Sequence, residues 1–313
     1  MQRLGYLGRR LGYVLITLWG VSLLLFVMLQ LLPGGPAEAM LGITATQQQV
    51  DALNQELGLD RPVVAQYVDY MGRLIRGDLG DSLVFGRPVV DVIGDALPAT
   101  LKLAVYVVAL STLSTVTLAT LAASFRGRAI DHVIRALPLI GVGMPGFWIG
   151  AMLLFLFALT FPFFPAGGIE EGFAGALRSL FLPALTLAIS VSAILIRSLR
   201  RGLIDVLESD HVLTARAKGL RGVRLVVRHV LPNAAIPTVT LMGLVFVSLL
   251  GGALIVESVF AIPGVGQLLV NGFKRHDMPL VMGIALLSAA AILLVNLLID
   301  VVYSLLDPRV SLR

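Results

Sequence analysis

A run of small and basic residues is the part of this sequence best suited to recognising another protein. It comprises Thr214, Ala215, Arg216, Ala217, Lys218 and Gly219, and Leu231 and Pro232 follow twelve residues after its end. Small side chains let a second backbone approach closely, and the two cations can fix the register of that contact through ion pairs. Because such charges enter a bilayer only at high cost, the run is expected in water, where a soluble partner can dock.

A second candidate region begins at an acid that ends a long apolar stretch and is followed by a Pro- and Gly-rich turn. Its candidate residues are Glu257, Phe260, Pro263, Gly264 and Gly266. An ionisable group at such a depth is a functional candidate by default, although it can equally pair with local backbone N–H groups. The turn is apolar and rigid, so we expect it to act as a gate or to touch an external protein.

Residue types that carry covalent chemistry lack the spacing that such chemistry needs. The four histidines show no metal-ligand spacing; they are His132, His211, His229 and His276. There is no cysteine and no Gly-x-Ser-x-Gly elbow. A phosphate-binding loop needs Gly-Lys followed by Ser or Thr, and none of the three lysines follows a glycine. We therefore expect no catalytic residue, no metal site and no cofactor.

The composition predicts the elements that hold these residues. Hydrophobic residues make up 57% of the 313 and charged residues 14%, whereas a soluble domain has about 25% charged residues. Crossing the hydrocarbon core takes about 20 apolar residues, and six stretches are long enough. They are 11–32, 103–125, a span within 136–161, 179–196, 233–256 and 278–299. The sequence predicts an all-α integral membrane protein with six transmembrane helices.

The distribution of Lys and Arg predicts the orientation. With a cytoplasmic N-terminus, sixteen of the 24 basic residues fall in inside segments, eight of them between positions 197 and 228. We therefore expect a multi-pass protein of the cytoplasmic membrane with both termini in the cytoplasm. The net charge of +5 reflects this asymmetry and does not indicate nucleic-acid binding.

The long segment between the first two spans, residues 34–98, is expected to fold outside the membrane as short helices. Thr46 and Gln49 fit a capping box, Gly58 can end that helix in a left-handed conformation, and Pro62 is suited to begin the next helix. The helices could lie on the membrane surface or receive a soluble partner. A third role is to cap the helical bundle.

The basic run lies in the longest inside loop. A helix is expected over residues 203–218, and Gly219 would end it. A second short helix would carry three arginines at helical spacing, and contact with lipid headgroups is the alternative role for them.

At this loop the sequence resembles the membrane-spanning subunits of binding-protein-dependent ABC importers. The family motif is Glu-Ala-Ala, three residues, Gly, nine residues, Ile, one residue, Leu-Pro. Gly219, Leu231 and Pro232 occupy its fixed positions, but Leu213 stands in place of the acid and His229 in place of the Ile. The local form Thr-Ala-Arg-Ala-Lys-Gly-Leu is similar to the peptide and nickel branch of the family.

Further matches to this branch occur in order along nearly the whole chain. They are Leu-Leu-Pro-Gly at 31–34, Gly-Asp-Leu-Gly-Asp-Ser at 77–82, Leu-Pro-Ala-Thr-Leu at 97–101, Pro-Gly-Phe-Trp at 145–148, Glu-Ser-Val-Phe-Ala-Ile-Pro-Gly-Val-Gly at 257–266 and Leu-Asp-Pro-Arg at 306–309. The resemblance implies a type I ABC importer permease fold. It implies four kinds of partner: a second homologous permease, two cytoplasmic ABC ATPases, an extracytoplasmic substrate-binding protein and membrane lipid.

The resemblance also implies that the basic run is a coupling helix seated in a groove of the ATPase, with Leu231 and Pro232 fixing the start of the fifth span. We expect three regions: residues 1–94 with the first span and the outer segment, residues 95–306 with the permease core, and residues 307–313 as a cytoplasmic tail. The expected substrates are di- and oligopeptides, and nickel, glutathione or another small solute is the alternative. An ion-coupled secondary transporter would need charges in the spans, which are nearly free of them. A structural scaffold would not need the coupling pattern.

Overall fold

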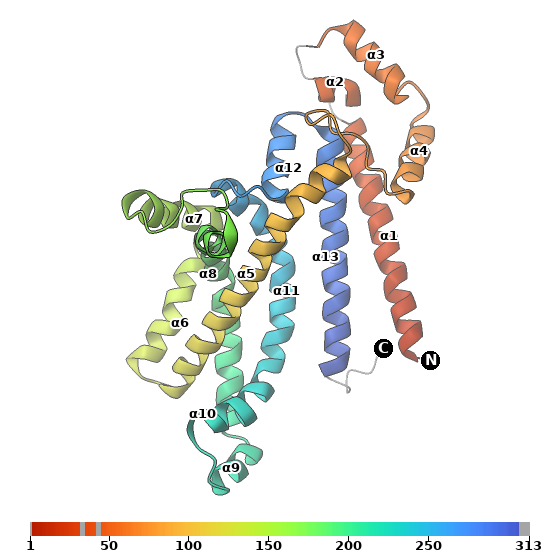
Figure 1. Cartoon of the computed structure of the whole chain (residues 1–313). Coiled ribbons are helices and arrows are strands. Elements are labelled where there is room, and N and C mark those ends of the chain that lie inside the picture. Colours follow the sequence, from red (N-terminus) through yellow and green to blue (C-terminus); the bar gives the residue numbers. More distant parts are fainter. Residues whose placement is uncertain (1, 32–34, 42–44, 307–313) are drawn as a thin grey trace. The chain divides into compact units, whose positions relative to one another are not determined.

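The computed structural model describes residues 2–31, 35–41 and 45–306. Within these residues there are helices and loops but no strand, apart from an isolated β-bridge between Asp81 and Pro88. The all-α prediction is confirmed. The expected tail, residues 307–313, lies outside the described residues. The chain divides into two compact units, one mainly from Met1–Ala99 with Gly264–Leu297 and the other mainly from Thr100–Pro263 (Figure 1).

The first unit contains the N-terminal helix, the short helices that follow it, and helices from near the C-terminus. Its elements are α1 (Gln2–Gln30), α2 (Gly35–Leu41), α3 (Gln47–Leu57), α4 (Val63–Ile75), the beginning of α5 (Val89–Ser124), α12 (Val265–Lys274) and most of α13 (Met278–Leu306). The expected short helices between the first two spans are therefore present.

Local capping chemistry sets the ends of α3, as the sequence predicts. The Thr46 hydroxyl accepts a hydrogen bond from the Gln49 N–H at 3.4 Å, and the Gln49 side chain accepts one from the Thr46 N–H at 2.9 Å. Gly58 ends the helix in the left-handed region at φ +64°, where a glycine carries no steric penalty. Pro62 occupies the N-cap of α4, one position before the helix begins.

A buried cluster joins the start of α5 to the start of α13 within the first unit. Val89, Val92 and Ile93 pack with Leu280 and Ile284. All five side chains are apolar and nearly inaccessible to solvent, so their contact excludes water and stabilises the pairing of two segments that are far apart in the sequence.

The fully buried carboxylate of Asp277 holds the same region together through hydrogen bonds. It accepts bonds from the Ser82 hydroxyl and from the N–H groups of Leu83 and Val84, each of the latter at 3.2 Å. It also accepts one from the Leu280 N–H at 3.3 Å, which caps the first turn of α13. The Gly-Asp-Leu-Gly-Asp-Ser match therefore ends at a residue that fixes a loop to a helix start.

The second unit contains the remaining helices. They are the rest of α5, α6 (Ala129–Val142), α7 (Gly146–Leu154), the π-helix η1 (Phe155–Thr160), α8 (Gly172–Leu207), α9 (Asp210–Ala217), α10 (Gly222–Leu225), the π-helix η2 (Val226–Val230) and α11 (Leu231–Val259). The helix expected over 203–218 is interrupted at Glu208 and Ser209, where Ser209 takes the N-cap position of α9. The Ser209 hydroxyl makes no capping bond to α9 and instead donates to the Val206 carbonyl in the last turn of α8.

Helix α8 is the central element of the second unit. It packs against α6, α7 and α11, and 72% of its apolar 18-residue stretch is buried. Gly202 permits the close approach to α11, because a Cβ built there would lie 2.6 Å from the Ala234 carbonyl oxygen. The continuous apolar character that predicts a membrane span therefore also supplies the core of this unit.

Five helices in the described part of the chain are long and apolar enough to cross a membrane. The segments are Gly8–Gln30, Val89–Ser124, Gly172–Leu207, Gly222–Gly243 and Met278–Leu297. The span expected within 136–161 is divided instead: α6 ends at Val142, and the shorter apolar helix Gly146–Thr160 begins after Pro145. Proline has no N–H to donate and disfavours helical geometry in the residue before it, so the helix breaks there.

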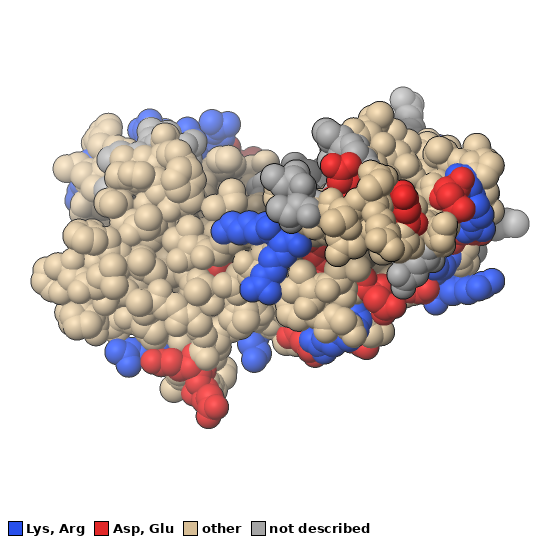
Figure 2. All heavy atoms as spheres, turned by 90° about the horizontal axis from the view of Figure 1, so that it is seen from above, with Lys and Arg blue, Asp and Glu red and all other residues tan. Residues whose placement is uncertain are grey.

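The surface in Figure 2 is mostly uncharged. Acidic and basic side chains gather together on the part that carries α3 and α4. Many large apolar side chains of the long helices are also exposed, among them Leu15, Ile16 and Val105, and acyl chains can cover such groups at little cost.

Candidate functional site

The basic run occupies α9 and the turn that follows it. Val212 and Ala215 form the inner face of α9 and are buried in a cluster with Leu199, Leu203 and Leu225. Ala215 therefore packs against the chain's own core, and it does not present a surface to a partner in this structure. Its small side chain lets α9 lie close to α8.

The other members of the run are exposed. Thr214, Arg216, Ala217 and Lys218 all face solvent. The Thr214 hydroxyl donates to the Asp210 carbonyl at 2.9 Å, so it is used within the helix. Arg216 and Lys218, separated by Ala217, are thus exposed at the end of a helix whose opposite face is anchored.

Gly219 ends this element in a left-handed conformation at φ +86°. Its N–H donates to the Arg216 carbonyl at 2.9 Å, and the Leu220 N–H donates to the Ala215 carbonyl at 3.1 Å. No atom lies within 4 Å of a Cβ built on Gly219, so the requirement for glycine comes from the backbone angle and not from crowding within this chain.

Leu231 and Pro232 begin α11 directly after the π-helix η2. Leu231 is half-buried against the α8–α9 cluster, and Pro232 is exposed. Proline is tolerated in the first turn of a helix, and the wider π-helical turn before it accommodates the change in hydrogen-bond register. This arrangement places the basic loop directly before the start of the long helix α11.

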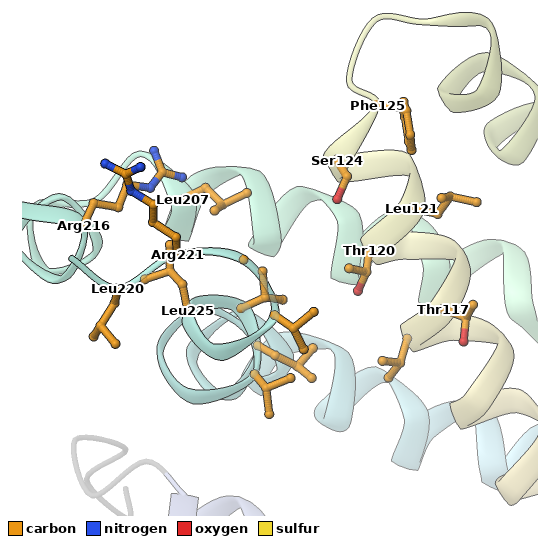
Figure 3. Close-up of a pocket in the computed structure, with 16 residues that line it drawn as sticks. Thr117, Thr120, Leu121, Ser124, Phe125, Leu207, Arg216, Leu220, Arg221 and Leu225 are labelled. Carbon is orange, nitrogen blue, oxygen red and sulfur yellow. The ribbon is translucent and has the colours of Figure 1, made fainter.

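A groove of about 950 Å³ lies beside the basic run. Its walls come from the last turns of α5, the end of α8 and the α10–η2 segment. Figure 3 shows the guanidinium groups of Arg216 and Arg221 at one end, across from the helix that carries Thr117, Thr120 and Ser124. Sequence reasoning did not find this groove, because one wall comes from α5 and the others from a loop much later in the chain.

An ion pair close to this region was also missed. The Arg200 guanidinium on α8 makes two hydrogen bonds to the Asp131 carboxylate on α6, at 2.7 and 2.6 Å, and Asp131 also accepts the Gly127 N–H at 3.0 Å. The bond from Arg200 holds the pKa of Asp131 below its usual range, and the Gly127 bond acts in the same direction, against the effect of burial. A second ion pair joins Arg126, which follows α5, to Glu208, which follows α8, at 2.6 Å. Both of these side chains are exposed.

Glu257 is fully buried near the end of α11. Its carboxylate accepts a hydrogen bond from the Thr100 hydroxyl of α5 at 2.7 Å. Thr100 belongs to the Leu-Pro-Ala-Thr-Leu match, so two matches that are 157 residues apart meet at this bond.

The turn after Glu257 is anchored by an aromatic side chain. Phe260 is buried, its ring lies against Gly150, and its carbonyl accepts the Gly168 N–H at 3.1 Å. Ala261 adopts a positive φ of 47° and is exposed, as is Pro263. The exposed tip of the turn is therefore Ala261 and Pro263, while Phe260 is an internal anchor.

The remaining two residues of this candidate region belong to α12. Gly264 is its N-cap and Gly266 lies in its first turn, and both are buried. Within the described part of the chain, no three His, Asp or Glu side chains gather as a metal site would require.

Comparison with protein families identifies two matching models. Residues 115–312 match "Binding-protein-dependent transport system inner membrane component", and residues 3–104 match the N-terminal model of such membrane components.

Several individual proteins are similar over nearly their whole length. A probable D,D-dipeptide transport system permease protein of Escherichia coli (strain K12) is 37% identical, covering 96% of this chain and 95% of its own. A di/tripeptide transport system permease protein of Pseudomonas aeruginosa (strain UCBPP-PA14) is 36% identical, with 98% of each chain covered. A glutathione transport system permease protein of Escherichia coli (strain K12) is 36% identical, covering 99% of this chain and 100% of its own.

A solved structure supports the fold. The crystal structure of an amino acid ABC transporter with histidines has a TM-score of 0.51 at 18% identity, covering 68% of this chain and 94% of the other. At this identity the likeness concerns the arrangement of helices alone.

Proposed function

Since the chain belongs to the inner membrane components of binding-protein-dependent transport systems, we propose that it forms half of a translocation pathway for di- and oligopeptides. ATP hydrolysis on partner subunits drives the transport, and this subunit carries out no covalent chemistry. The relatives named for D,D-dipeptide and di/tripeptide transport support the peptide substrate. The relative named for glutathione supports the alternative, in which glutathione, nickel or another small solute uses the same architecture.

The observation that carries this proposal is the anchored, basic helix α9. One face is buried through Val212 and Ala215, while Arg216 and Lys218 are exposed beside a left-handed Gly219. A helix fixed on one side can transmit a push from a partner to α8 without bending. We assign the contact with a cytoplasmic ABC ATPase to the exposed members of the run, and Ala215 acts by holding α9 in place.

The complete transporter in this proposal has the partners that the family description implies. A second homologous permease supplies the other half of the pathway, two cytoplasmic ATPases supply energy, and an extracytoplasmic substrate-binding protein delivers the solute. Burial of Glu257 and its bond to Thr100 support a role in an outer gate. Exposure of Pro263 supports contact with the binding protein, and we assign Phe260, Gly264 and Gly266, which are buried, to the same contact or gate region.

The proposed topology has six crossings with both termini in the cytoplasm. Five long helices and the divided pair of α6 with Gly146–Thr160 supply them. The pair counts as one crossing because 15 helical residues reach only about 22 Å, less than the hydrocarbon thickness. Residues 34–98 lie outside. In this scheme residues 1–94, 95–306 and 307–313 are the outer-segment region, the permease core and the tail.

Uptake of labelled di- and oligopeptides tests the function in cells that lack this chain, with nickel and glutathione measured in parallel. Peptide uptake should disappear on deletion and return with the intact gene. Loss of nickel or glutathione uptake with peptide uptake unchanged would overturn the peptide assignment.

A charge reversal tests the coupling role within the assembled transporter. We expect the double change Arg216→Glu with Lys218→Glu to abolish uptake and stimulated ATPase activity while the permease still inserts. Arg224→Glu is the matched control, because Arg224 is an exposed arginine of the same loop outside the run. Equal loss in both variants would argue against a specific contact at the run.

A further inference from the structure

Helix α4 packs along one end of α1 in an antiparallel manner. The Gln30 amide donates to the Gln66 side chain at 2.6 Å, the Phe26 and Tyr67 rings lie 5.2 Å apart, and the Ser22 hydroxyl lies 3.4 Å from the Met71 sulfur. Contacts therefore move back along α1 as α4 advances, and Figure 1 shows the two helices side by side.

These contacts place α4 at membrane depth, given the topology proposed above. Arg10 is the last charged residue in α1, and a crossing of about 20 residues counted from it reaches Gln30. Ser22 lies eight residues before Gln30, which is about 12 Å along a helix. A helix that reaches Ser22 has therefore followed α1 into the outer leaflet.

One face of α4 has no cover from the described residues. Val64, Val68 and Ile75 are 76%, 62% and 81% exposed, and spacings of four and seven residues put them on one side of the helix. The side that meets α1 is a different one. These aliphatic groups would be costly to leave in water. Val68 and Ile75 lie deeper than the contact between Gln30 and Gln66, where acyl chains would reach them, and Val64 lies at the boundary.

The charged residues of α4 form a third face. Asp69 pairs with Arg61 at 2.5 Å, and Arg73 and Arg76 are exposed. Figure 2 shows acidic and basic side chains interspersed over this part of the surface. An aliphatic stripe beside a face rich in arginine suits a helix that enters one leaflet alongside α1, because long arginine side chains can extend to the polar layer.

We infer that α4 enters the outer leaflet beside α1, with its Val64, Val68 and Ile75 stripe facing lipid. The inference rests on the proposed orientation, with residues 34–98 outside. It gives α4 a bilayer partner in place of a soluble one, and it makes α4 a second, partly inserted helix beside α1.

Spin labels test this directly, because this chain has no cysteine and the partner subunits can be prepared with their cysteines replaced, which makes the introduced cysteine the only labelled site. Val68→Cys is labelled in the assembled transporter in lipid nanodiscs, and its collision rates with oxygen and with a water-soluble nickel chelate are measured. We expect the label at position 68 to collide more often with oxygen than with the chelate. Asp69→Cys, one residue away on the charged face, is the matched control and should favour the chelate.

The same measurement also gives the membrane depth of each label. Because α4 runs antiparallel to α1, a label at Ile75→Cys should report a greater membrane depth than one at Val64→Cys. Chelate dominance at position 68 would show an aqueous face, and low collision rates with both reagents would show a protein partner; either result overturns the inference. Peptide uptake by the same variants reports separately on the proposed function.

Discussion

The Arg200 guanidinium donates a hydrogen bond to each carboxylate oxygen of Asp131, with Nε 2.7 Å from Oδ1 and Nη2 2.6 Å from Oδ2. Asp131 is 1% exposed and Arg200 17% exposed, so water screens this pair little. The pair joins α6 to α8 a short distance before α8 gives way to α9. It is therefore placed to keep the anchored basic helix in register with the rest of the second unit.

Removing one partner of this pair should destabilise the protein strongly. We expect Asp131→Ala to lower the free energy of unfolding by about 3–5 kcal/mol, because it leaves a largely buried guanidinium without its counter-charge. Thermal unfolding of the purified protein in one detergent measures the effect. The matched control is Glu208→Ala, which removes the exposed pair with Arg126 and should cost less than about 1 kcal/mol. Similar losses in the two variants would contradict the role assigned to burial.

The same pair should leave a signature at acid pH. Bonding to Arg200 lowers the pKa of Asp131 in the folded protein, so its contribution to stability is complete above the ordinary carboxyl pKa of about 3.9. The contribution is lost as the pH falls through the lower native value. We expect the difference in melting temperature between the native protein and Asp131→Asn to stay constant from neutral pH to about pH 5 and to narrow below about pH 4. A difference in melting temperature that grows on acidification would contradict a lowered pKa of Asp131.

The effect of replacing Gly219 should depend on how readily the new residue adopts a positive φ. Alanine at φ +86° costs about 1–2 kcal/mol, whereas asparagine visits the left-handed region more readily. We expect Gly219→Ala to impair stimulated ATPase activity more than Gly219→Asn, with membrane insertion unchanged in both. Transporter ATPase assays with matched amounts of permease measure this. Equal failure of the two variants would instead indicate that a partner's backbone needs the space of the missing side chain.

Gly202 should be intolerant of a methyl group for a steric reason. A Cβ at this position would lie 2.6 Å from the Ala234 carbonyl oxygen, so α8 and α11 would have to move apart. We expect Gly202→Ala to cost about 1–3 kcal/mol, seen as a lower melting temperature. Gly94→Ala in α5 serves as the control, because no atom lies within 4 Å of its built Cβ. An unchanged melting temperature in Gly202→Ala would mean that the two helices separate at little cost.

Several features of this protein follow from local properties of the sequence and could be predicted. Long apolar stretches predict the long helices, the Thr46 and Gln49 pair predicts a helix start, and Gly58 predicts its end. The break in the span within 136–161 also has a local cause, because Pro145 lies directly before the helix that begins at Gly146. Motifs in fixed order predict the family because their order and spacing are properties of the chain itself.

Only the tertiary structure decided which candidate residues are buried and which are exposed. Ala215 and Phe260 are buried against their own chain, while Arg216 and Pro263 remain exposed, although all four are equally part of their motifs. Arg200 with Asp131, and Thr100 with Glu257, are 69 and 157 residues apart. Hydrophobicity, capping and turn preference depend on near neighbours and can be read along the chain. Ion pairing and burial depend on which helices pack together, and that packing is settled by long-range contacts that no single segment encodes.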